Sequence, residues 1–103
     1  MSTTEKPAIN RVVLTARICE LEAQRYTPAG LPALNFTLEH ESELQEAGQA
    51  RQVKLVMKAV AFGAIAERIA KQAIGSIWCF EGFLAAGRNG KSVVFHIQEF
   101  SQD

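Results

Sequence analysis

The fold is decided by the stretch from Arg25 to Thr37, which reads Arg-Tyr-Thr-Pro-Ala-Gly-Leu-Pro-Ala-Leu-Asn-Phe-Thr. Pro28 fixes φ at the corner of a turn, and Gly30 can adopt a positive φ. From Ala33 the residues alternate between apolar and polar, which is the period of a half-buried β-strand. The stretch therefore predicts the end of one strand, a tight turn and the start of the next strand.

The same alternation recurs on both sides of this hairpin. It predicts strands over residues 10–21, 33–41, 52–61, 76–85 and 93–100. The polar segment 42–51 contains Gly48 and predicts a loop. From Phe62 to Ala73 the apolar residues follow a helical spacing, which Gly75 ends. Asn89-Gly90 predicts a hairpin turn before the last strand. The predicted order of elements is β-β-β-α-β-β.

This order, within about 100 residues, predicts an all-β chain with one short helix, folded as an OB-fold. In that fold, five strands form a Greek-key barrel and the helix closes one end. A chain of 103 residues can bury one core. We therefore expect a single domain over residues 9–103, preceded by a flexible N-terminal tail over residues 1–8.

The apolar and thiol residues indicate what the barrel encloses. Alternation places Trp78 in the core with Phe36, Phe62 and Phe95. Cys19 and Cys79 lack metal-type spacing and lie in predicted strands, so they are expected to be buried free thiols in a reducing compartment. The sequence contains neither a long apolar run nor a secretory signal, so we expect a cytoplasmic protein.

The charges are balanced overall but not along the chain. The sequence has 11 basic and 11 acidic side chains. Residues 1–50 contain four basic and seven acidic side chains, and residues 51–103 contain seven and four. Proteins that depend on phosphate contacts usually carry a basic excess. Any affinity for nucleic acid is therefore expected to be modest and steeply dependent on salt.

The sequence contains no signature of catalysis or metal binding. His40 and His96 lie on different predicted strands, and neither has the spacing of a zinc site. The sequence has no nucleophile signature and no phosphate-binding glycine loop. We therefore expect no enzyme activity, metal or cofactor. The acidic run of Glu39, Glu41, Glu43 and Glu46 is interpreted as a solvated loop, with a docking surface for a basic partner as the alternative.

Several segments together resemble a known family. They are the hairpin quoted first, Asn10-Arg11-Val12-Val13-Leu14, Phe36 to Ser42, Glu46-Ala47-Gly48 and Gly75 to Gly82. They are similar to the PriB family (primosomal replication protein N), short OB-fold relatives of bacterial single-strand DNA-binding proteins. The sequence stops at Asp103, where a replicative single-strand binding protein would continue into a Gly/Gln-rich tail with an acidic ending. This difference favours the short family.

The resemblance implies a bacterial accessory protein of the replication-restart primosome. Such a protein would be a homodimer that binds single-stranded DNA and scaffolds helicase loading at stalled forks without making or breaking a bond. The implied partners are the PriA helicase and, in some systems, DnaT and the resident single-strand DNA-binding protein. Two alternatives stay open: a general strand-coating protein, and a protein-interaction module with little DNA affinity.

OB-folds hold single strands by stacking bases on aromatic rings and placing phosphates against a basic groove. The candidate nucleic-acid-binding residues are Arg17, Arg25, Tyr26, Arg51, Lys54, Lys58, Phe83, Arg88 and Lys91. Family resemblance places the dimer contact on the outward side of the first strand, at Arg11, Val13 and Thr15. Relatives can carry an aromatic residue at the position of Lys54 and a longer lysine-rich loop around Arg88 and Lys91. We therefore expect weaker single-strand binding than the family norm.

Overall fold

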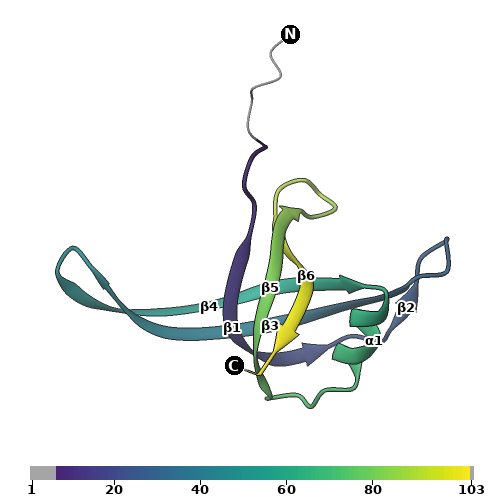
Figure 1. Ribbon diagram of the computed structural model, residues 1–103, viewed down its shortest axis with the longest axis horizontal. Helices are drawn as coiled ribbons and strands as arrows, with labels where there is room; N and C mark the ends of the chain where they lie inside the picture. The colour runs from purple at the N-terminus through teal and green to yellow at the C-terminus, as the bar shows by residue number, and fades with distance from the viewer. Residues whose placement is uncertain (1–6, 103) are drawn as a thin grey trace, which may run out of the picture.

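The computed structural model describes residues 7–102, which form a strongly curved sheet closed into a barrel (Figure 1). The elements are β1 (Val12–Leu21), β2 (Arg25–Tyr26), β3 (Pro32–Glu46), β4 (Gln49–Phe62), α1 (Ala64–Ala70), β5 (Ile77–Ala86) and β6 (Val93–Ser101). The strands follow the order β1-β5-β6-β4-β3-β2, and pairing of β1 with β3 closes the barrel. The predicted OB-fold is confirmed, with β2 as a short addition beside β3.

The turn predicted at Pro28 and Gly30 forms as expected. The carbonyl of Thr27 accepts a hydrogen bond from the N–H of Gly30 at 2.8 Å, and Gly30 has a φ of 88°. Arg25 then pairs with Ala33 across β2 and β3. The turn therefore fixes where β3 begins and holds Arg25 beside it.

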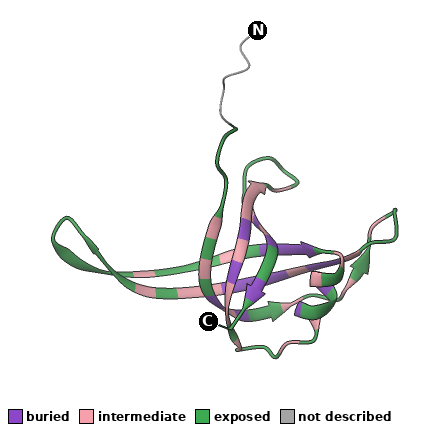
Figure 2. Cartoon of the chain, in the orientation of Figure 1, coloured by how far each residue is buried: buried purple, intermediate pink, exposed green. Residues whose placement is uncertain are grey.

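The core fills the barrel with alternate residues of every long strand (Figure 2). The Phe80 ring lies between Phe36 and Phe100, with a centroid distance of 6.1 Å to each. Full burial of one such side chain contributes about 1.5–3 kcal/mol. The prediction that Phe36 and Phe95 are core residues is confirmed. Trp78 is half-buried, packed edge-on against Phe100.

The predictions that Phe62 is a core residue at the start of the helix and that Cys19 is buried were wrong. Phe62 ends β4 with 42% of its surface exposed and is not the start of the helix. The strand continues to Phe62, and Gly63, with a φ of 82°, lets the chain turn into α1. Cys19 is exposed because a β-bulge follows Ile18, whereas Cys79 is half-buried; both thiols are free.

The segment 42–51, predicted as a loop, is the outer part of a long β-hairpin. β3 runs to Glu46 and β4 starts at Gln49, joined by Ala47 with a φ of 53° and Gly48 with a φ of 79°. Two positive φ values are typical of the two-residue type I′ turn. Within the described chain, residues 40–55 pair only with each other. We call residues 40–55 the arm; it extends from the left of the barrel in Figure 1.

Two further expectations concern regions at the limits of the structure. The first six residues of the tail predicted over residues 1–8 lie outside the described residues. Of the rest, Pro7 and Ala8 have no regular secondary structure and are exposed. In the described chain, no helix has both the length and the apolar character needed to cross a membrane.

Candidate nucleic-acid interface

Three of the predicted cationic residues line one groove. Arg25 comes from β2, Lys58 from β4 and Arg88 from the loop between β5 and β6, and the groove encloses about 550 Å³. The remaining lining residues are Glu22, Asn35, Phe36, Ala59, Gly87, Ser92 and Val94. Glu22 is the only acidic residue in this lining, so the groove carries a positive excess. A concave surface of this kind attracts phosphate.

Two of these cations are held by uncharged partners. The Oδ1 atom of Asn35 accepts hydrogen bonds from Nε and Nη2 of Arg25, at 3.2 and 2.7 Å. Nζ of Lys58 lies 3.4 Å from Oγ1 of Thr37, the residue opposite it in the ladder. Neither cation forms an ion pair with a described residue, and the Glu20 carboxylate accepts a hydrogen bond from the Thr37 hydroxyl at 3.4 Å.

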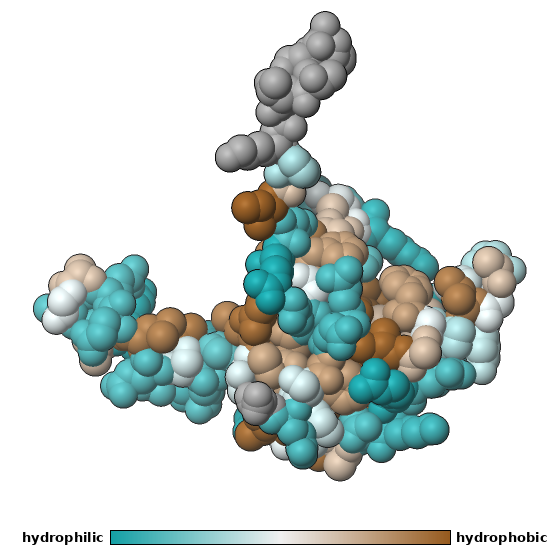
Figure 3. Space-filling view, viewed as in Figure 1, coloured by the Kyte–Doolittle hydropathy of each residue, from teal (hydrophilic) through white to brown (hydrophobic). Residues whose placement is uncertain are grey.

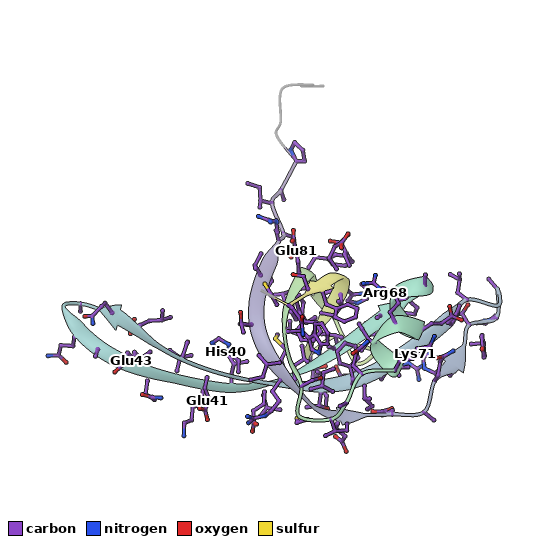
Figure 4. The ribbon with its side chains drawn as sticks, turned by 60° about the horizontal axis from the view of Figure 1, so that its bottom comes forward. His40, Glu41, Glu43, Arg68, Lys71 and Glu81 are labelled. Carbon is purple, nitrogen blue, oxygen red and sulfur yellow. The ribbon has the colours of Figure 1, made fainter. Side chains whose placement is uncertain are left out.

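Four of the cations outside the groove are paired with carboxylates. Arg17 bonds Glu39; Arg11 lies 2.8 Å from Glu81, Arg51 lies 3.1 Å from Glu46, and Lys54 lies 3.8 Å from Glu41. Figure 4 shows Glu41 and Glu43 along the arm, away from the barrel. Because opposite charges this close largely cancel at a distance, these cations attract phosphate less than those of the groove. The acidic run is therefore part of strand β3 and not a loop, although Glu41, Glu43 and Glu46 are exposed to solvent as predicted.

The pair of Arg17 and Glu39 also affects the ionisation of the guanidinium. The hydrogen bond to Glu39, together with the attraction between the two charges, raises the pKa of Arg17. Arg17 lines a separate hollow with Thr15, Glu39, Glu41 and Ile77 rather than the groove. The sequence placed Arg17 among the binding residues, but the structure separates it from the groove.

The two candidate stacking residues have different surroundings. Tyr26 is 63% exposed on β2. Phe83 is half-buried and stacked on His96, with centroids 4.9 Å apart and an interplanar angle of 14°. Phe62 lies 6.1 Å from the same histidine ring. The three rings form an aromatic surface on the outside of β4, β5 and β6.

This aromatic surface continues from the groove. Val94 lines the groove, and His96 is two residues further along β6, so both project from the same face of the strand. Sequence reasoning missed Phe62 and His96 as members of the surface. The exposure of Phe62 could have been inferred from its parity with exposed Lys58, had the predicted strand been extended from Ala61 to Phe62.

The loop between β5 and β6 fixes the third groove cation. The N–H of Gly87 donates to the carbonyl of Ser92 at 2.8 Å, and Oδ1 of Asn89 accepts from the N–H of Lys91 at 2.8 Å. These bonds hold a tight turn that carries Arg88 to the groove wall. Lys91 is exposed on the same turn.

The residues proposed for dimer contact lie along a strand edge. The main-chain N–H and C=O of Ile18 are hydrogen-bonded to the segment that leads into β5. Successive residues of a strand direct these groups to opposite edges, so those of Val13 and Thr15 face the edge away from β5. The Thr15 carbonyl lies 2.6 Å from Nδ1 of His40. Among the described residues, β3 pairs with β1 only from Arg17 onward. The edge at Val13 is therefore unpaired in one copy of the chain, and its side chain is 50% exposed.

Comparisons with known proteins agree with this geometry. Residues 10–99 match a family described as "Another single-strand binding protein family". The Replication restart protein PriB of Bordetella pertussis is 45% identical over 92 residues, covering 88% of this chain and 86% of that protein. A crystal structure of PriB from Ralstonia solanacearum superposes with a TM-score of 0.85 at 40% identity, covering 92% of this chain and 98% of that one.

A more distant structure shares the fold alone. The SSB domain of a Synechococcus protein matches with a TM-score of 0.70 at 17% identity, covering 95% of this chain and 100% of that one. The closed barrel is an OB-fold, and the matching family model places the chain in the class of single-strand binding proteins. Within that class, the chain belongs to the PriB family of replication restart proteins.

Proposed function

We propose that this protein binds single-stranded DNA in its cationic groove and acts as an accessory of the replication-restart primosome. The observation that carries the proposal is the convergence of Arg25, Lys58 and Arg88 on one groove, where no carboxylate of residues 7–102 is hydrogen-bonded to them. Phosphates would lie along these cations, and bases would stack on the adjoining rings of Phe83, His96 and Phe62. Tyr26 and Lys91, both exposed near the groove cations, would extend the contact.

The role at the fork is scaffolding. The relatives are named replication restart proteins, which supports contact with the PriA helicase, and with DnaT or the resident single-strand DNA-binding protein where these are present. Bound to an unpaired strand, the barrel would hold DNA and helicase together while the replicative helicase is loaded. The test is an anisotropy titration of labelled single- and double-stranded oligonucleotides, with the helicase present and absent. Preference for single strands and tighter binding with helicase support the role. Helicase binding without DNA affinity at any salt would favour the interaction-module alternative.

Salt dependence gives a quantitative check on the groove. Three phosphate contacts to a single strand predict a slope of about −2 for the logarithm of affinity against that of salt concentration. Affinity should therefore fall about 20-fold between 50 and 200 mM salt. The measurement is the same anisotropy titration at four salt concentrations. Nanomolar affinity at physiological salt, or a slope several units steeper, would contradict a binding site limited to this groove.

We also propose that two copies pair along β1. The free main-chain groups at Val13 can exchange hydrogen bonds with the same groups of an antiparallel second copy, which is a self-complementary contact. A charged residue at this position would be brought against its own copy, so Val13→Lys is expected to convert the dimer into a monomer in light-scattering chromatography. Val93→Lys is the matched control, because Val93 is also an exposed strand valine, at 53%. A V13K protein that stays dimeric, or a monomeric wild type, contradicts the pairing.

A further inference from the structure

In the groove, the Arg25 guanidinium is hydrogen-bonded to an uncharged amide, whereas each of the four ion pairs described above joins a cation to a carboxylate. Oδ1 of Asn35 accepts from both Nε and Nη2 of Arg25. A guanidinium has five N–H donors in a planar fork. Two are used by Asn35, which leaves the others to meet a ligand on the remaining sides of the fork. Asn35 thereby fixes the plane of the guanidinium without adding a negative charge.

Asn35 is well placed to act as an anchor. It lies inside β3, opposite Val60 of β4, and its main-chain carbonyl accepts a hydrogen bond from the N–H of Glu22 at 3.0 Å. Arg25, in contrast, lies on a strand of only two residues and is exposed. A long side chain on a short exposed strand samples many rotamers, and fixing it on binding lowers affinity. A rigid acceptor removes part of that cost before the ligand arrives.

We propose that Asn35 is a positioning residue of the groove: its side-chain carbonyl holds Arg25 in a phosphate-binding orientation while leaving its charge uncompensated. The inference rests on the proposed function, because it assigns a role within the same DNA-binding groove. Asn35 orients the guanidinium without neutralising it, whereas in the ion pairs a single carboxylate does both. A carboxylate would orient the guanidinium equally well but would also cancel its attraction for phosphate.

Two substitutions of Asn35 distinguish orientation from charge. Asn35→Ala removes the anchor and leaves the charge, so affinity for a labelled single-stranded oligonucleotide should fall about fivefold with an unchanged salt slope. Asn35→Asp keeps an acceptor but pairs Arg25 with a carboxylate. Its affinity should also fall, and its salt slope should become shallower by about 0.7, the contribution of one phosphate contact. Gln24→Ala is the matched control, because Gln24 adjoins Arg25 but its amide contacts the Tyr26 hydroxyl.

A double-mutant cycle tests whether Asn35 acts through Arg25. In an Arg25→Ala background, Asn35→Ala should weaken binding by less than about twofold, because the group that it positions is gone. Thermal melts verify that each variant is folded. If the wild type binds but Asn35→Ala does not lower its affinity, or lowers it equally in the wild-type and Arg25→Ala backgrounds, the positioning role is overturned. The proposed function is then left intact. A folded wild type with no affinity for single strands overturns the proposed function, and the inference with it.

Discussion

Replacing Arg25, Lys58 and Arg88 together by alanine is expected to weaken binding of a single-stranded oligonucleotide at least 100-fold at 50 mM salt. The estimate follows from the loss of three phosphate contacts, each of which releases counterions and contributes about one order of magnitude at this ionic strength. The three side chains line the groove from β2, β4 and the β5–β6 loop. Because all three are on the surface of the groove and not in the core, the melting temperature should change little. Fluorescence anisotropy measures the affinity, and circular dichroism the folding.

The matched control is a second triple variant that removes the same charge from carboxylate-paired positions. Arg17, Arg51 and Lys54 are bonded or close to Glu39, Glu46 and Glu41. Replacing these three cations by alanine should weaken binding less than about fivefold, since the local charge that attracts phosphate is already small. Equal losses in the two triple variants would show that binding follows total charge and that the groove is not the site.

Gly82→Ala is expected to destabilise the barrel by about 4 kcal/mol or more, which is at the upper end of single-residue effects. A Cβ at this position would lie 1.8 Å from the carbonyl oxygen of His96. The obstacle is main chain of β6, paired with Gly82 beside a register shift in β5, so it cannot move without opening the barrel. The free energy of unfolding from denaturant titration measures the effect.

Gly87→Ala supplies the control for that prediction. Its Cβ would approach Oγ of Ser92 at 2.4 Å, but a serine hydroxyl can rotate away. We expect a loss below about 1 kcal/mol. Similar unfolding free energies for the two variants would mean that β5 and β6 tolerate a wider separation than the structure has.

The sequence was sufficient to predict the barrel because its strands are buried on one face. Leu34, Phe36 and Leu38 alternate with polar residues, and all three are core residues. The arm could not be recognised by the same rule. Residues 42–51 face solvent on both sides of a projecting ribbon, so nothing selects an alternating pattern, and their polarity was interpreted as a loop.

The site was predictable in composition but not in geometry. Lys54 and Lys58 share one face of a strand, so sequence reasoning gave them equal weight. The structure places Lys58 in the groove beside Thr37, and Lys54 on the arm opposite Glu41. The register of β3 and β4 decides which acidic residue lies opposite each cation. That register is set by the turn at Ala47 and Gly48, which was not predicted because residues 42–51 were interpreted as a loop.

The arm has a consequence for how this chain can vary. Among the described residues, none between 40 and 55 belongs to the core cluster or packs against it, and Figure 3 shows the outer arm as mainly hydrophilic. Its length is therefore uncoupled from barrel stability. Removing or inserting two residues on each strand would preserve which side chains share a face, so the arm can be trimmed or extended as a module while the groove and the closed barrel stay as they are.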